Sequence, residues 1–116
     1  MINIRELESK IVERLKPLDP EKIILFGSYA SGNPGEDSDI DLYVVTKDDF
    51  IPQNYTEKKI LVRKVSKQIQ DIRQSVSVDL LVHTKKMSKK FFDIGSSFSK
   101  ELAEKGKILY GRRDSP

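Results

Sequence analysis

The most constraining feature of this chain is a pair of apolar segments joined by a glycine-containing turn, between residues 23 and 45. Residues 23–26, Ile-Ile-Leu-Phe, form a short apolar run that is typical of a strand buried on both faces. Gly27 and Ser28 end that run. Because a glycine lets the backbone approach a ligand closely, and a serine adds a hydroxyl beside exposed N–H groups, we expect a ligand-binding turn directly after this strand.

A second strand is predicted over residues 39–45, and it begins with two acidic residues in an Asp-x-Asp pattern. Side chains alternate between the two faces of a strand, so Asp39 and Asp41 share one face. The other face carries Ile40, Leu42 and Val44. Two crowded carboxylates are unfavourable unless a cation lies between them. Oxygen ligands favour Mg²⁺ or Mn²⁺ over Zn²⁺. Taken alone, such a pair is also found as two solvated acids on a surface strand.

The segment between these two strands combines a helical turn with a loop. Residues 29–31, Tyr-Ala-Ser, can form the first turn of a short helix whose free N–H groups lie at Gly27 and Ser28. Residues 32–38 are rich in glycine, proline and short polar side chains, which predicts a surface loop. The turn is therefore a candidate phosphate site.

The order of these residues resembles a known signature. Gly27 and Ser28, ten further residues, and then Asp39 and Asp41 are similar to the Gly-Ser-x10-Asp-x-Asp pattern of the polymerase-beta-like nucleotidyltransferases. The flanking sequences Gly-Ser-Tyr-Ala-Ser-Gly and Asp-Ser-Asp-Ile-Asp-Leu resemble the minimal nucleotidyltransferases in particular. The resemblance covers residues 1–110. It implies an α/β (α+β) nucleotidyltransferase fold, with a small mixed sheet and helices packed on one face.

A third strand is predicted over residues 76–82, and Asp79 is its one charged residue. From the strand alone, Asp79 can be an edge-strand charge that opposes aggregation. The resemblance implies a different role, because the family has a third carboxylate on a later strand beside the Asp-x-Asp strand. His83 follows this strand, and we expect it to be a surface residue.

The resemblance implies metal-dependent nucleotidyl transfer, with AMP moved from ATP to a hydroxyl group. Gly27 and Ser28 would bind the nucleotide. Asp39 and Asp41 would hold one Mg²⁺ or Mn²⁺ ion on the triphosphate, and both would share a second ion with Asp79 that activates the acceptor hydroxyl. Asp79 is also a candidate acceptor for the hydroxyl proton.

The acceptor side is missing from a chain of this length, so the resemblance implies a second protein. In HEPN/MNT toxin–antitoxin pairs the partner is a small helical HEPN protein, and the nucleotidyltransferase acts as its antitoxin. A homodimer is a further possibility. The alternative is a catalytically weak or inactive binding module that neutralises its partner by complex formation. Ser31 favours this alternative, because family members often carry an arginine there.

Composition limits the remaining choices. The chain has 116 residues, which suits one domain, and 34% are charged against 37% hydrophobic. It contains no apolar run long enough to span a membrane and no signal-peptide pattern, so we expect a cytoplasmic protein. With no cysteine and one histidine, disulfides are excluded and a protein zinc site is disfavoured. Any metal must be held by carboxylates.

Positive charge is concentrated towards the C-terminus. Residues 83–116 hold nine Lys/Arg against four Asp/Glu. Such a segment can face an acidic partner, a nucleic acid or a triphosphate, or it can be an ordinary solvated surface. The aromatic residues among these lysines, Phe91, Phe92 and Phe98, are assigned to the core, so direct nucleic-acid binding is not expected.

Periodicity and turn residues define the other elements. Asn3, with Glu6 three residues later, predicts the start of a helix that ends before Pro17. Further predictions are a long helix over residues 56–74, one bent or two short helices over 87–105 ending at Gly106, and a strand over 107–110. Residues 1–110 are expected to form the domain and residues 111–116 a frayed tail.

Overall fold

The structure, a computed structural model, describes residues 3–32 and 39–111. Its elements in chain order are α1 (Ile4–Leu15), η1 (Lys16–Leu18), β1 (Lys22–Phe26), α2 (Ser28–Ser31), β2 (Ile40–Val45), α3 (Tyr55–Gln68), α4 (Gln70–Ser75), β3 (Val78–His83), α5 (Lys85–Ile94), α6 (Ser97–Lys105) and β4 (Lys107–Gly111). The strands form a single sheet, and the helices pack around it, which confirms the predicted α/β fold class.

The four strands form one mixed sheet in the order β3-β2-β1-β4. β1 pairs antiparallel with β2 and with β4, whereas β2 pairs in parallel with β3. A parallel pair needs a long crossover connection, and α3 and α4 supply it. β1 and β2 occupy the centre of the sheet, and the middle residues of both are buried, as the apolar run at residues 23–26 predicts.

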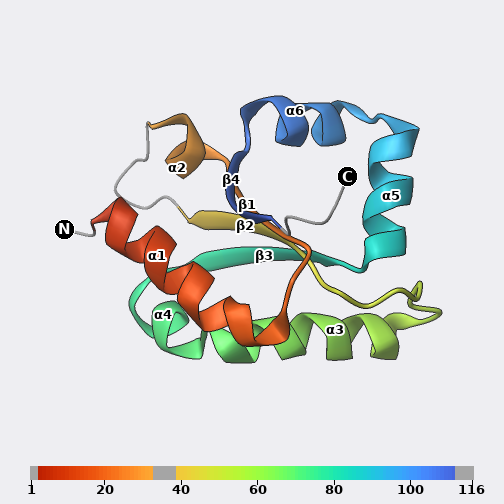
Figure 1. The fold of residues 1–116 in the computed structure, drawn as a ribbon, viewed down its shortest axis with the longest axis horizontal. Coiled ribbons are helices and arrows are strands. Elements are labelled where there is room, and N and C mark those ends of the chain that lie inside the picture. Colours follow the sequence, from red (N-terminus) through yellow and green to blue (C-terminus); the bar gives the residue numbers. More distant parts are fainter. Residues whose placement is uncertain (1–2, 33–38, 112–116) are drawn as a thin grey trace.

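One face of the sheet is covered by α1, α3 and α4 (Figure 1). Alternate residues of the strands point to this face and pack against the apolar stripe of each helix. The buried members of this larger core cluster are Leu7, Ile11, Leu15, Ile23, Leu25, Ile40, Leu42, Val44, Leu61, Val65, Ile69, Ile72, Val78 and Val82. This is the helical layer that the sequence predicts.

The opposite face is partly covered by α5 and α6, so the expectation of helices on one face alone is wrong (Figure 1). Ile24, Tyr43 and Val45 point to this side and form a second cluster with Leu102 of α6. The side chains that pack against that cluster include Phe26, Leu81, Phe91 and Phe92. The physical reason is that β1 and β2 are apolar on both faces, and an uncovered apolar face would remain in water.

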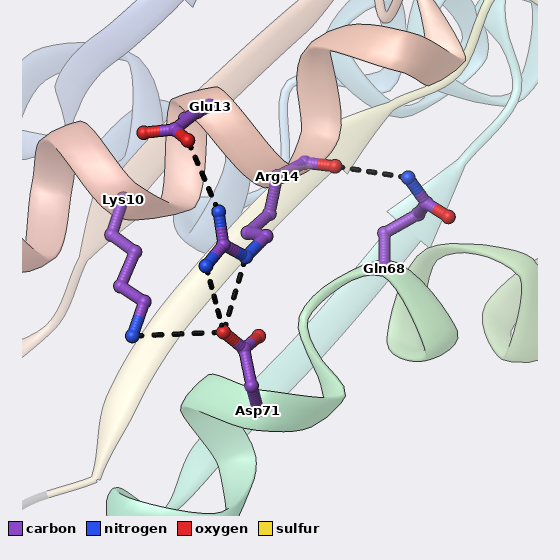
Figure 2. A network of polar contacts seen from close by, with 5 residues as sticks. All are labelled: Lys10, Glu13, Arg14, Gln68 and Asp71. Atoms are coloured by element: carbon purple, nitrogen blue, oxygen red, sulfur yellow. Dashed lines mark hydrogen bonds and ion pairs between the residues drawn. The ribbon is translucent and has the colours of Figure 1, made fainter.

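A polar network fastens α1 to the α3–α4 corner (Figure 2). The Arg14 guanidinium contacts the Asp71 carboxylate through Nε at 3.1 Å and through Nη2 at 3.0 Å. Lys10 adds a longer contact of 3.6 Å to the same carboxylate, and the Gln68 amide donates to the Arg14 carbonyl. The guanidinium beside Asp71 lowers the pKa of that carboxyl below its usual value. Asp71 is thus neutralised from the α1 side.

Local sequence signals explain most helix boundaries. The Asn3 side chain accepts hydrogen bonds from the N–H groups of residues 5 and 6, which confirms the predicted start of α1. The predicted helix over residues 56–74 is two helices, because the chain leaves helical geometry at the fully buried Ile69. Gly95, with φ of 68°, ends α5 in a left-handed conformation, so the segment before Gly106 also forms two helices.

Two sequence expectations fall partly outside the described residues. The loop predicted at residues 32–38 is described only at Gly32, and the tail predicted from residue 111 only at Gly111, which is the last residue of β4. Within the described part of the chain, no helix combines the length and the apolar character that crossing a membrane requires.

Candidate active site

The turn after β1 depends on a glycine. Gly27 has φ of 74° and ψ of −154°, a conformation that residues with a Cβ rarely adopt. A Cβ placed on Gly27 would also collide with the Asp41 carboxylate. Both the backbone conformation and the available space therefore require glycine here. The turn lies against Asp41, the first acid of β2, and the predicted approach of a ligand to this turn stays a prediction.

The short helix α2 follows this turn directly, as predicted for residues 29–31. Tyr29 and Ala30 pack against the larger core cluster, which holds α2 at the end of the sheet. The Ser31 N–H donates to the Gly27 carbonyl at 3.2 Å, and the Ser31 hydroxyl donates to the Ser28 carbonyl at 3.0 Å. The hydroxyl of Ser31 is thus used within α2 itself.

The sheet register brings two of the predicted acids together. In the antiparallel β1–β2 pair Asp41 lies opposite Phe26, and in the parallel β2–β3 pair it lies opposite Asp79. Asp41 therefore stands between the end of β1 and Asp79. By the two-residue period of a strand, it shares its face with Tyr43, the side on which α5 and α6 pack. Asp39 is the residue directly before β2, and it is exposed.

The surroundings of Asp41 raise the proton affinity of its carboxyl group. The pKa of the half-buried Asp41 carboxyl is raised above its ordinary value, first by burial and then by the negative charges of Asp79 and Asp39. None of the ion pairs found among residues 3–32 and 39–111 neutralises these three carboxylates. Across those same residues no group of three or more acidic or histidine side chains is already gathered as a metal site. Asp41 is therefore an electrostatic neighbour of Asp39 and Asp79, and no cationic side chain of the described residues pairs with these acids.

A cavity of about 270 Å³ opens beside the Gly27 turn. Its walls come from the end of β1, from α2 and from α6, and they consist of Phe26, Gly27, Ser31, Phe98, Glu101, Leu102, Lys105 and Gly106. The rings of Phe26 and Phe98 meet edge to face with their centroids 5.6 Å apart. The cavity thus has an apolar wall and charged side chains. Gly27 lines it and also lies against Asp41, so the cavity adjoins the acid cluster of Asp39, Asp41 and Asp79.

The sequence analysis does not predict that residues of α6 line this cavity. Phe98 was assigned to the core, but it is 41% exposed. The spacing of Phe98, Glu101 and Lys105 places them on one helix face, which is a signal that the sequence does contain. The sequence does not say which other element that face meets, because α6 and Gly27 are far apart along the chain.

His83 is half-buried, so it is less exposed than the expected surface residue. Its Nδ1 lies 2.8 Å from the Tyr43 hydroxyl, which also donates to the Ser88 hydroxyl at 2.9 Å. Burial lowers the pKa of His83 to about 4, and burial raises the pKa of Tyr43 to about 12. His83 is four residues from Asp79, roughly 13 Å along the strand, so this network packs α5 against β3 away from the acids.

Comparisons with known proteins agree with this geometry. A relative from Methanocaldococcus jannaschii, which carries the provisional name of a protein adenylyltransferase, is 32% identical over 107 residues, covering 92% of this chain and 90% of the relative. A solved toxin–antitoxin structure with AMP-PNP has a TM-score of 0.56 at 24% identity and covers 91% of this chain and 74% of that one.

A second solved structure, a tri-AMPylated Shewanella oneidensis HEPN toxin in complex with an MNT antitoxin, has a TM-score of 0.50 at 22% identity. It covers 93% of this chain and 72% of that chain. At these identities the two structures show a shared fold. The family described as "Polymerase beta, Nucleotidyltransferase" matches residues 9–115, which is most of the sequence. The chain therefore belongs to the polymerase beta nucleotidyltransferase family, and it is a nucleotidyltransferase.

Proposed function

We propose that this protein transfers AMP from ATP to a hydroxyl group of a partner protein. The observation that carries the proposal is the register that sets Asp41 against Asp79 in β3, directly beside the Gly27 turn. Nucleotidyl transfer needs metal-binding acids and phosphate-binding N–H groups on the nucleotide side, and Asp41, Asp79 and the Gly27 turn would supply them at one end of the sheet. The family assignment and the name of the archaeal relative support the same reaction.

The acids fit a divalent metal by their chemistry. Asp39, Asp41 and Asp79 offer only carboxylate oxygens, the ligands that Mg²⁺ and Mn²⁺ prefer. The pKa of Asp41 is raised first by burial and then by the charges of Asp79 and Asp39, and a bound cation would relieve that repulsion, which supports the proposal. Two such ions, when bound, would neutralise the triphosphate and make the acceptor hydroxyl more acidic. Because the acids do not form a ready cage, we propose that nucleotide and ions complete the site together.

The remaining groups position the reactants. The N–H groups at Gly27 and Ser28 would bind phosphate oxygens, and the cavity beside them would receive the adenine base against Phe98. The acceptor hydroxyl oxygen forms a bond to the α-phosphorus, and the bond from that phosphorus to the bridging oxygen breaks. Pyrophosphate leaves with the electron pair of that bond. Asp79, exposed at the sheet edge, would take the hydroxyl proton.

The acceptor would belong to another chain in the cytoplasm. Asp79 and Asp39 are exposed, and water must be excluded from the reacting groups for transfer to win over hydrolysis. A partner that covers these acids would exclude it. Structural neighbours are a toxin–antitoxin complex with AMP-PNP and an AMPylated HEPN toxin with its MNT antitoxin, so we propose a HEPN-type helical protein as that partner and the role of antitoxin for this chain.

Label transfer from α-labelled ATP tests this function. The protein is incubated with ATP in magnesium or in EDTA, with and without the product of the neighbouring gene, and labelled protein is then resolved by electrophoresis. The proposal predicts label on the partner that requires both magnesium and this chain. Label found in EDTA, or no label on any protein while the complex forms, would contradict it.

The second candidate is a binding module that neutralises its partner without chemistry. Ser31 is the observation that favours it, because its hydroxyl is bonded within α2 and supplies no positive charge to a triphosphate. This candidate predicts that a variant with Asp41→Asn still neutralises the partner in cells. The enzymatic proposal predicts that the same variant loses protection.

A further inference from the structure

We propose that the outer face of α3 and α4 binds the phosphate backbone of double-stranded nucleic acid, independently of its base sequence. The groove on this face has a volume of about 460 Å³ and is lined by Arg63, Ser66, Lys67, Gln70, Arg73 and Gln74. We call it the α3–α4 groove. It lies on the far side of the sheet from the acid cluster, since α3 and α4 cover the face opposite to that of Asp41.

The α3–α4 groove carries positive charge that no ion pair balances within the described part of the chain. Arg63, Lys67 and Arg73 are exposed, and none of them takes part in the ion pairs found among residues 3–32 and 39–111. The neighbouring acid, Asp71, is engaged by Arg14 and Lys10 on the α1 side, as Figure 2 shows. The lining of the groove contains no acidic residue. An anion would therefore meet three cations without a competing carboxylate.

The arrangement of the cations is unfavourable for the isolated helix. Lys59, Arg63 and Lys67 follow one another at four-residue spacing along α3, so like charges stack on one face at about 6 Å intervals. Like-charged pairs at this spacing destabilise a helix. A bound row of phosphates would reverse that repulsion, because each phosphate lies between positive groups.

The groove is also pre-arranged by hydrogen bonding. The Arg73 guanidinium on α4 donates from Nη1 to the Ser66 hydroxyl on α3 at 3.0 Å, which holds this cation across the break between the two helices. A guanidinium fixed in this way keeps further N–H donors for phosphate oxygens. The amides of Gln70 and Gln74 add neutral donors of the kind that contact a nucleic-acid backbone.

The lining favours nucleic acid over an acidic protein. Protein–protein interfaces have an apolar core, whereas all six residues of the α3–α4 groove are polar or charged. Protein–nucleic acid interfaces are more polar and more positive. The groove offers no aromatic ring for stacking, so it suits the backbone of a duplex and not unpaired bases. The sequence argument against nucleic-acid binding rests on the lack of exposed aromatic rings for base stacking. Contacts to the phosphate backbone of a duplex do not need such rings.

Fluorescence anisotropy with a short labelled DNA duplex of mixed sequence tests the proposal. The three groove cations are replaced together in Arg63→Gln, Lys67→Gln and Arg73→Gln. The matched control has the same loss of charge on α5 and α6, through Lys86→Gln, Lys90→Gln and Lys100→Gln. Circular dichroism confirms that both variants fold, which exposed substitutions on intact helices should allow.

Three neutralised phosphates predict a slope of about −2.7 for log K against log salt, which is roughly a 40-fold loss of affinity between 50 and 200 mM salt. We expect the groove variant to bind at least about 10-fold more weakly with a flatter slope, while the control and a second duplex sequence behave like the starting protein. Absence of duplex binding, or equal losses in both variants, would overturn the proposal. The proposal would also be overturned if binding of a polyglutamate peptide required the groove cations and binding of the duplex did not.

Discussion

At the scale of single residues, Gly27 is the position where sequence and site depend on each other most closely. Gly27→Ala should lower stability by about 1–3 kcal/mol, because φ of 74° with ψ of −154° is a backbone region that is essentially restricted to glycine, and by more because the new Cβ meets the Asp41 carboxylate. Gly32→Ala is the control for a positive φ, since Gly32 has φ of 82° and ψ of 9°, and apart from its chain neighbours no atom of residues 3–32 or 39–111 lies within 4 Å of a Cβ added to it. Thermal unfolding should therefore rank Gly27→Ala below Gly32→Ala, and only Gly27→Ala should lose ATP binding. Equal losses of ATP binding in both variants would show that Gly27 is not part of the nucleotide site.

Asp41 gives a second prediction at this scale, which concerns pH. Its pKa is raised in the folded protein, so the charged form destabilises the metal-free fold above the ordinary carboxyl pKa of 3.8. Asp41→Asn should therefore raise the melting temperature in EDTA at pH 7, and the gain should shrink as the pH falls towards 3.8. A lower melting temperature at pH 7 would show that Asp41 has a structural role.

At the scale of elements, α6 contributes the wall that the sequence interpretation lacks. Phe98→Ala should raise the KM for ATP about 10-fold, because stacking of a base on an aromatic ring is worth about 1–3 kcal/mol. The fold should change little, as Phe98 is 41% exposed. Ile94→Ala is the control, since Ile94 is 78% exposed and does not line the cavity. An unchanged KM in Phe98→Ala would place the base elsewhere.

The contact between α5 and β3 gives a prediction about acid stability. His83 is neutral in the fold because burial lowers its pKa from 6.5 to about 4. The unfolded chain binds a proton that the folded chain excludes, so stability is lost as the pH falls from 6.5 towards 4. His83→Gln should remove part of this loss, measured as the difference in melting temperature between pH 7 and pH 4.5. The same pH dependence in both proteins would contradict the buried role of His83.

Elements also show what a sequence can and cannot predict. The period of two in β2 is a local property, so the shared face of Asp39 and Asp41 follows from the sequence alone. The position of Asp79 opposite Asp41 depends on the parallel register, which a family resemblance suggests but no local pattern specifies. The burial of β1 on both faces already implies two covering layers. The expectation of one helical layer overlooked that signal.

At the scale of the whole molecule, the sheet separates two surfaces with different charge. The acids and the cavity lie on the side of α5 and α6, and the α3–α4 groove lies on the side of α1. The sequence places its largest surplus of lysine and arginine in residues 83–116. The structure also gathers cations on α3 and α4 that form no ion pair within residues 3–32 and 39–111, because helical spacing collects residues that are dispersed along the sequence. Long-range placement of this kind is what the sequence alone does not supply.

The central claim is that the catalytic site lies where β2 and β3 begin, at Asp41 and Asp79. The variant Asp79→Asn tests this claim most directly. The rate of label transfer from α-labelled ATP to the partner is measured for the starting protein, for Asp79→Asn and for Asp49→Asn, an exposed acid outside the site. We predict a loss of at least about 100-fold for Asp79→Asn and an unchanged rate for Asp49→Asn, with both variants still folded. Full transfer by a folded Asp79→Asn protein would contradict the account.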